Sequence, residues 1–134
     1  FIELLATLVA ARRHAPGESS LEVAGGAFAR SVAYLNERLS DDITVADLAA
    51  VAHLSTRRYL DVFRASFGKT PKQYIIEQRI EIAKELMLET GSILHSSLDA
   101  GFSNLSHFYR IFKRYTGMTP KQFIAGHEAH SRTA

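Results

Sequence analysis

The sequence contains an internal repeat whose two copies lie 49 residues apart, and this repeat limits the folds that the chain can adopt. Seven residues recur unchanged: Phe63, Gly68, Thr70, Pro71, Lys72, Gln73 and Ile75 return as Phe112, Gly117, Thr119, Pro120, Lys121, Gln122 and Ile124. A solenoid needs about three or more stacked copies to bury a continuous core. Two copies in 134 residues therefore indicate one duplicated supersecondary unit.

Helical periodicity runs through almost the whole chain. Apolar residues recur at spacings of three and four, and no segment alternates with the period of a strand. We therefore predict an all-α fold of about seven helices, with a short N-terminal helix in front of them. The expected helices span about residues 1–12, 27–39, 45–52, 56–67, 71–89, 93–100, 104–116 and 120–126.

These helices group into four segments. Residues 1–26 are expected to form the N-terminal helix and a linker, because the stretch from His14 to Gly26 holds a proline and three glycines. Residues 27–70 form a first helix-turn-helix unit and residues 71–91 a long connecting helix. Residues 92–134 form a second helix-turn-helix unit and a tail.

Capping residues mark several helix ends. Thr44 stands three residues before an aspartate, which is the acidic variant of a capping box. Ser55 is expected to cap a helix that ends at Gly68. Thr70 and Pro71 then open the connecting helix, since proline is favoured at a first helical position.

The net charge of +2 conceals an uneven distribution. Residues 55–73 hold five cations and one acid, and residues 101–122 hold four cations and no acid, so each window carries +4. The remainder of the chain carries −6. Two basic windows that coincide with the repeat indicate a polyanionic partner.

The second helix of each unit is the predicted contact with DNA, because in a helix-turn-helix that helix enters the major groove. Its outward side chains are suited to base edges, since Arg binds guanine, Asp accepts from cytosine and apolar groups contact the thymine methyl. The candidate base-contacting residues are Arg57, Arg58, Leu60, Asp61, Ser106, His107, Tyr109 and Arg110. The candidate phosphate-contacting residues are Ser55, Arg64, Lys72, Asn104, Lys113 and Lys121.

Two of these assignments have a simpler alternative. Arg57 and Asp61 are four residues apart on one helix, and a solvent-exposed ion pair between them is worth only a few tenths of a kcal/mol. For Leu60 and Tyr109, the alternative to a base contact is that they are ordinary exposed residues or part of an interdomain contact. The chain as a whole has an alternative too: a helical protein-interaction module whose basic stripes bind an acidic partner.

The connecting helix also predicts a spacing. If it keeps the two recognition helices roughly parallel, they lie about 34 Å apart, which is one turn of B-DNA. One polypeptide then reads two successive major-groove segments on one face of the duplex.

Several classes of protein are excluded or disfavoured. The chain has no cysteine, which excludes disulfides and thiolate metal sites and favours the cytoplasm. It has no nucleophile elbow, phosphate-binding loop or dinucleotide fingerprint, so we expect neither an enzyme nor a cofactor. His127 and His130 are one residue too close for a two-histidine zinc motif, so no metal is predicted. The apolar residues 1–11 are too short to span a bilayer.

A family resemblance rests on residues in both units. They are Leu48, Ala49, Ser55, Phe63 and Gly68 in the first unit, Tyr74, Ile75, Arg79, Ile80, Ala83, Leu86 and Met87 in the connecting helix, and Gly101, Phe102, Ser106, His107, Phe108, Arg110, Phe112, Lys113, Gly117, Thr119 and Pro120 in the second unit. With these residues, the stretch from about Phe28 to Ile124 resembles the DNA-binding domain of AraC/XylS-type transcription regulators.

The resemblance implies several partners. Domains of this kind bind promoter DNA and control transcription, often by contact with RNA polymerase, as an activator does. They usually follow a domain that senses a small-molecule effector and often forms a homodimer, so residues 1–26 are expected to end such a domain. The sequence leaves open activation or repression, and leaves open what the apolar residues of 1–12 contact.

Three residues depart from the family pattern. Ser96 and Ser97 stand where a branched aliphatic residue and an alanine are usual, and a buried Ser96 hydroxyl costs about 1–3 kcal/mol unless it is bonded. The second unit is therefore expected to be the looser one. Tyr59 replaces a usual leucine, which is a change of size at an apolar position.

Overall fold

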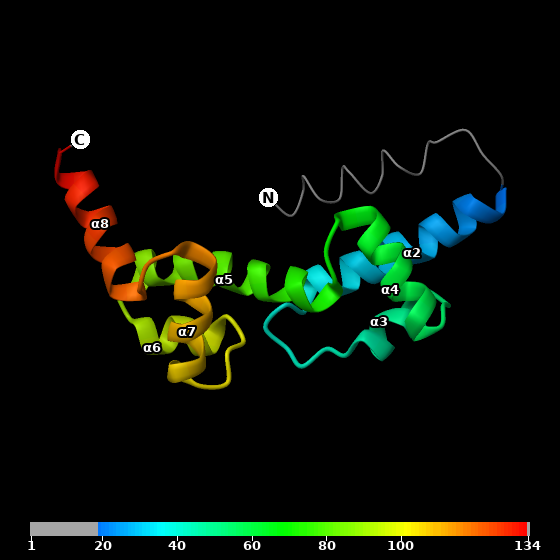
Figure 1. Cartoon of the computed structure of the whole chain (residues 1–134), viewed down its shortest axis with the longest axis horizontal. Helices are drawn as coiled ribbons and strands as arrows, with labels where there is room; N and C mark the ends of the chain where they lie inside the picture. The colour runs from blue at the N-terminus through cyan, green and yellow to red at the C-terminus, as the bar shows by residue number, and fades with distance from the viewer. Residues whose placement is uncertain (1–18, 134) are drawn as a thin grey trace. The chain divides into compact units, whose positions relative to one another are not determined.

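The computed structural model describes the backbone of residues 19–133 and the side chains of residues 26–129 (Figure 1). Within that range the chain is helical, and no strand is present. The helices are α2 (Ser19–Glu37), α3 (Val45–Val51), α4 (Thr56–Phe67), α5 (Pro71–Thr90), α6 (Ile93–Asp99), α7 (Leu105–Thr116) and α8 (Pro120–Thr133). The predicted all-α fold is confirmed. The helix expected over residues 1–12 lies outside the described residues.

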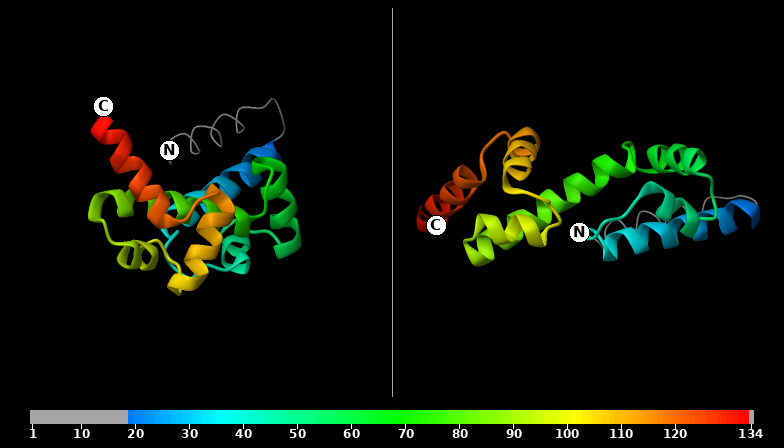
Figure 2. Two further views of the ribbon diagram at one scale, coloured as in Figure 1. Left: turned by 60° about the vertical axis from the view of Figure 1, so that its left-hand side comes forward. Right: turned by 90° about the horizontal axis from the view of Figure 1, so that it is seen from below.

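The chain divides into two compact units, at Gln73 and Tyr74 near the start of α5. In the first unit, α3 packs against both α2 and α4. In the second, α7 packs against both α6 and α8. Each unit therefore holds one helix-turn-helix, α3–α4 or α6–α7, and Figure 2 shows these pairs from two further sides.

The predicted caps of the first helix-turn-helix are present. The Thr44 and Asp47 side chains each accept a hydrogen bond from the other residue's backbone N–H, both at 3.1 Å, so the capping box is complete. Ser55 Oγ accepts from the backbone N–H of Arg58 at 3.1 Å. α4 ends at Gly68, whose φ of 72° is left-handed and suits glycine.

The repeated Thr-Pro-Lys-Gln sequence starts a helix in each unit. Gln73 Oε1 accepts from the Thr70 backbone N–H at 2.9 Å, and Thr70 Oγ1 accepts from the Gln73 N–H at 3.2 Å. Thr119 and Gln122 make the same two bonds at 2.9 and 3.1 Å. These are capping boxes at the starts of α5 and α8, which explains why the threonine and glutamine recur unchanged.

The core of the first unit is a cluster of rings between α2 and α4. Phe28 of α2 lies with its ring centroid 5.5 Å from Tyr59 and 6.0 Å from Phe63, both on α4. Leu48 and Ala49 of α3 are buried. On the inner face of α4, Tyr59 and Phe63 are fully buried, and Val62 and Ser66 are half-buried. Burying this face leaves the opposite face of α4 to solvent.

The core of the second unit joins α5, α6 and α7. Its buried residues are Ile80, Ala83, Met87, Ala100, Phe102, Phe108 and Phe112. The Phe108 ring lies 5.0 Å from Phe102 and 5.4 Å from Phe112. Phe112 in turn lies 5.7 Å from Phe123 of α8. These ring contacts bury one face of α7, just as the ring cluster of the first unit buries one face of α4.

The loop predicted between His14 and Gly26 is wrong from Ser19 onward, because α2 begins there and continues through Gly25 and Gly26. Each glycine costs about 1 kcal/mol in a helix interior. Glycine ends a helix when it adopts a left-handed conformation, however, and here it is flanked by alanines and other residues that continue the helix. The helix penalty of Gly25 and Gly26 was therefore not a sufficient reason to place the start of α2 after them.

The last helix is also longer than predicted. It was expected to end near Gly126 with a frayed tail, and α8 instead continues to Thr133. The reason is the same: one interior glycine weakens a helix without terminating it.

Candidate nucleic-acid interface

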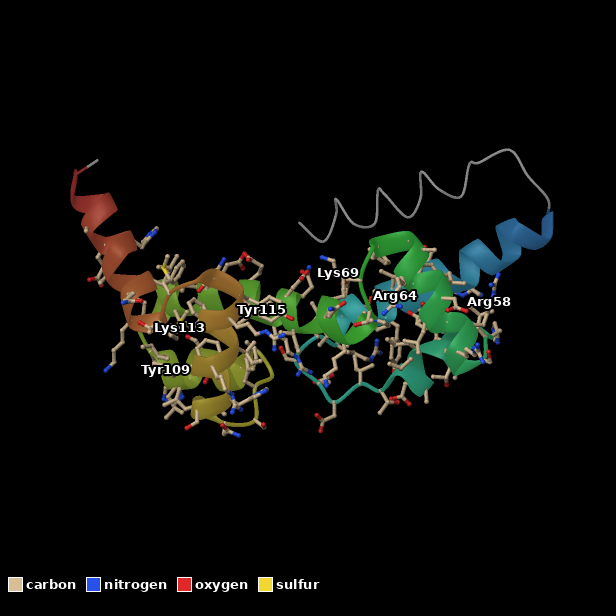
Figure 3. The ribbon with its side chains drawn as sticks, in the orientation of Figure 1. Arg58, Arg64, Lys69, Tyr109, Lys113 and Tyr115 are labelled. Carbon is tan, nitrogen blue, oxygen red and sulfur yellow. The ribbon has the colours of Figure 1, made fainter. Side chains whose placement is uncertain are left out.

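The outward face of α4 carries the charged residues that the sequence predicted there. Arg57, Arg58, Asp61 and Arg64 are exposed, and Leu60 is 36% exposed. Arg58 and Arg64 are labelled in Figure 3. Because the spacing of three and four places residues on one helical face, these side chains form a single surface.

Arg57 and Asp61 do not pair with each other. Among the described side chains, neither has a hydrogen bond or an ion pair, whereas Arg38 with Glu37 and Lys84 with Glu81 do form pairs. The solvent-exposed ion pair that was the simpler explanation for these two residues is therefore not formed. Both keep their full hydrogen-bonding capacity for a ligand.

The corresponding face of α7 is more strongly basic. Ser106, Arg110, Lys113 and Arg114 are exposed. Asn104 Oδ1 accepts from the backbone N–H of His107 at 2.7 Å, so the amide caps α7. The exposed face therefore combines three cations with no acid.

Two candidate residues of α7 lie partly within the core of their own unit. The Tyr109 ring is half-buried, with its centroid 6.4 Å from that of Phe108 (Figure 3). The His107 ring is half-buried as well, 6.2 Å from Phe102. Each side chain is therefore only partly available to a ligand.

The predicted phosphate-binding cations lie at helix ends. Arg64 and Lys113 are in the last turns of α4 and α7. Lys72 and Lys121 are exposed as the second residues of α5 and α8. Arg114, exposed beside Lys113, was not among the candidate residues, although it also lies in the second basic window.

A buried polar link lies beneath α4. Ser31 Oγ donates to the backbone carbonyl of Phe28 at 2.6 Å, so its 2.8 Å contact with Tyr59 Oη has the tyrosine as donor. Burial raises the pKa of Tyr59 to about 12, against a smaller lowering by the Ser31 hydrogen bond. The sequence indicated only a change of size at position 59, whereas the tyrosine also ties α4 to α2.

The buried serines of α6 are satisfied. Ser96 and Ser97 are 1% and 0% exposed. Ser96 Oγ lies 3.2 Å from Thr90 Oγ1, and Ser97 Oγ donates to the Leu94 carbonyl at 2.8 Å. The cost predicted for an unbonded hydroxyl at position 96 therefore does not arise.

The comparison with known families gives a match that begins in α3 of the first unit and extends through most of the second unit. The family model described as "Helix-turn-helix domain" matches residues 48–126, from α3 to α8. The "Uncharacterized HTH-type transcriptional regulator YobQ" of Bacillus subtilis is 36% identical over 94 residues, which is 69% of this chain and 39% of that protein. The chain belongs to the AraC/XylS family of helix-turn-helix regulators.

Other relatives and solved structures of this family agree. The "Melibiose operon regulatory protein" of Escherichia coli K12 is 34% identical over 91 residues, covering 67% of this chain and 30% of that protein. The DNA-binding domain of AdpA, solved in complex with a target DNA, superposes with a TM-score of 0.72 at 30% identity, covering 81% of this chain and 98% of that one. An AraC-type protein of Chromobacterium violaceum gives 0.68 at 25% identity, covering 75% and 90%.

This AraC/XylS chain spans less than two fifths of the length of the two relatives named above. Both relatives are regulators by name, and the two-unit helical architecture is that of the DNA-binding domains in the family. The alternative of a module for acidic proteins is not favoured. Along the described backbone, no helix combines the length and apolar character that a bilayer span requires.

Proposed function

We propose that the chain binds double-stranded DNA in a sequence-specific manner, with α4 and α7 as recognition helices in two successive major grooves. The observation that carries this proposal is the duplicated helix-turn-helix, in which the exposed face of each second helix holds three cations. A helix of this kind fits the major groove, and its cations replace counterions along the phosphates. The similarity to the DNA-binding domain of AdpA, which was solved in complex with a target DNA, supports the binding of DNA.

The side chains take two roles in this proposal. Base edges are read by Arg57, Arg58, Leu60, Asp61, Ser106, His107, Tyr109 and Arg110. Phosphates are bound by Ser55, Arg64, Lys72, Asn104, Lys113 and Lys121. Arg114 is added to this set because it is exposed beside Lys113. The Asn104 and Ser55 side chains already cap their helices, so their contact with phosphate comes from the free backbone N–H groups of the same turn.

Simultaneous contact by both units requires recognition helices about 34 Å apart on one duplex, or DNA that bends to meet them. We further propose that the domain works in the cytoplasm as part of a longer regulator. That regulator senses a small-molecule effector, forms a homodimer through another domain and contacts RNA polymerase. The greater length of the relatives supports this view. We assign the chain no enzymatic role.

Titration of fluorescent duplexes tests the proposal. A pool of random-sequence duplexes is first selected for binding, and the enriched and scrambled duplexes are then titrated at several salt concentrations. We expect log K to fall steeply with log salt and the enriched duplex to bind more tightly. Flat salt dependence contradicts DNA binding, and steep dependence without preference leaves a non-specific polyanion binder.

The variants Arg110→Ala and Lys113→Ala separate the two roles. Arg110→Ala is expected to relax the preference at one base pair, where a lost pair of bonds costs about 1–3 kcal/mol. Lys113→Ala is expected to weaken all sequences alike and to reduce the salt slope by about one. Equal and uniform losses from both variants contradict this division of roles.

A further inference from the structure

We propose that Asp61 is a filter in the first unit: it makes α4 reject DNA that lacks a cytosine amino group at the facing base pair, a rejection that α7 does not impose. This inference rests on the proposed function, since it concerns the same DNA-facing surface. It implies that a mismatched base pair costs more binding free energy when it faces the first unit than when it faces the second.

Asp61 has no structural task in α4. It is exposed in the middle of the helix, outside the first turn where a carboxylate stabilises the helix dipole. Aspartate is also among the weaker helix formers. Among the described side chains, none forms an ion pair with it, although Arg57 and Arg64 are one turn away on the same face. Stability of the first unit therefore does not account for this residue.

The carboxylate has a strong effect on DNA at this position. Asp61 is the only acid of residues 55–73, and it lies at the centre of a face that carries three arginines. Beside phosphates or the acceptor groups of guanine, a carboxylate is repelled and loses its water without gaining a donor. The major groove offers amino donors on cytosine and adenine, and the cytosine amino group suits a carboxylate better, because the adenine amino group lies beside the N7 acceptor of the same base. A facing guanine or thymine edge, which offers acceptors only, therefore leaves a desolvated, unpaired charge.

The matching residue of the second unit is Arg110, 49 positions further on. Arg110 is exposed, as are Lys113 and Arg114, and residues 101–122 contain no acid. When the facing base is not guanine, a guanidinium still binds a phosphate or water-bridged acceptor, so a mismatch costs this unit less. Both units prefer certain bases, but only α4 combines preference with repulsion, the second means by which specificity is achieved.

The test compares Asp61→Asn, which keeps the shape of the side chain and removes its charge, with wild type and with Arg110→Ala. Glu85→Gln is the matched control, because it removes one negative charge from an exposed position of α5 outside both basic windows. Each protein is titrated with the duplex enriched by wild type, with its three variants at the base pair facing Asp61, and with a random-sequence pool. That base pair is identified as the position where Asp61→Asn selects a different sequence logo.

Asp61→Asn is expected to bind the random pool several-fold more tightly, with a salt slope steeper by about one, and to lose on the order of tenfold of its preference for cytosine. Arg110→Ala is expected to change pool affinity in the opposite direction. Glu85→Gln should match wild type. An Asp61→Asn protein with unchanged pool affinity and an unchanged logo overturns the filter alone. A wild-type protein without salt-dependent binding overturns the proposed function and this inference together.

Discussion

The two helix-turn-helix units share the Thr-Pro-Lys-Gln helix start and the glycine helix stop but bury different polar groups. In the first unit, Tyr59 donates to Ser31 at 2.8 Å and connects α4 to α2 inside the core. At the matching position of the second unit stands Phe108, which has no hydroxyl and whose ring packs against Phe102 and Phe112 in the core cluster. There the buried hydroxyls are Ser96 and Ser97 of α6.

This difference shows what a duplicated unit has to keep. The Thr-Pro-Lys-Gln starts and the glycine stops recur because backbone N–H groups and left-handed residues allow few substitutes. Core polar groups differ freely, provided that each hydroxyl has a partner. In residues 26–129 no buried side-chain polar atom is left unpaired. The expectation that Ser96 loosens the second unit loses its main reason.

The largest expected effect tests whether the two aromatic cores are equivalent. Phe63→Ala and Phe112→Ala each remove a fully buried ring at matching positions, so each is expected to cost about 3–5 kcal/mol of unfolding free energy. Urea unfolding followed by circular dichroism measures the cost, and hydrogen exchange locates it. Protection should fall in α2–α4 for Phe63→Ala and in α6–α8 for Phe112→Ala. A loss below about 1 kcal/mol in one variant would show that the two cores are not equivalent.

Alkaline pH is expected to weaken the first unit selectively. The pKa of Tyr59 is about 12 in the folded chain and about 10 when unfolded. Its contribution to stability is therefore complete below about pH 10 and is lost as pH rises to about 12, a change of roughly 2–3 kcal/mol. The free energy of unfolding, followed from about pH 9 to about pH 12, should fall more in wild type than in Tyr59→Phe. If the unfolding free energies of wild type and Tyr59→Phe fall in parallel with pH, the Tyr59 hydroxyl is not held neutral by burial.

Removing the partner hydroxyls separates the two buried networks. Ser31→Ala leaves the Tyr59 hydroxyl without its partner in the core and is expected to cost about 1–3 kcal/mol. Ser96→Ala is expected to cost less than about 1 kcal/mol, because Thr90 Oγ1 is on an exposed residue and already donates to the Leu86 carbonyl. Thermal and urea unfolding measure both. If Ser96→Ala loses more unfolding free energy than Ser31→Ala, the buried hydroxyl network of the second unit is the more important one for stability.

The smallest expected effect concerns the feature that the units share most closely. Gln73→Ala and Gln122→Ala each remove the bond that satisfies a helix-start N–H, from Thr70 or Thr119 at 2.9 Å. Each is expected to cost roughly 0.5–1 kcal/mol, as for other caps. The two losses, measured by urea unfolding, should agree. A difference above about 1 kcal/mol would mean that one helix start has further support.

Much of the fold follows from local patterns. The ends of α3, α4 and α7 agree with the predictions to within one residue, since capping side chains and left-handed glycines act over a single turn. The wrong boundaries, at α2 and α8, both involve glycines inside a helix. There the local penalty of about 1 kcal/mol is smaller than the gain from continuing the helix, and a local rule does not weigh the two.

The candidate site follows less completely. The exposure of the α4 and α7 faces was predictable because it is the complement of a buried stripe with helical spacing. The half-burial of Tyr109 and His107 was not, because it depends on how Phe102 and Phe108 pack beside them.

The residue pattern alone was enough to predict the duplication, the helical class, the caps and the two basic windows, because each depends on residues within a turn or on a count along the chain. The folded structure was needed to show that Tyr59 bonds to Ser31, that Ser96 bonds to Thr90 and that Arg57 and Asp61 do not pair. Hydrogen bonds need atoms within about 3.5 Å, and that distance depends on rotamers and packing which no residue spacing specifies.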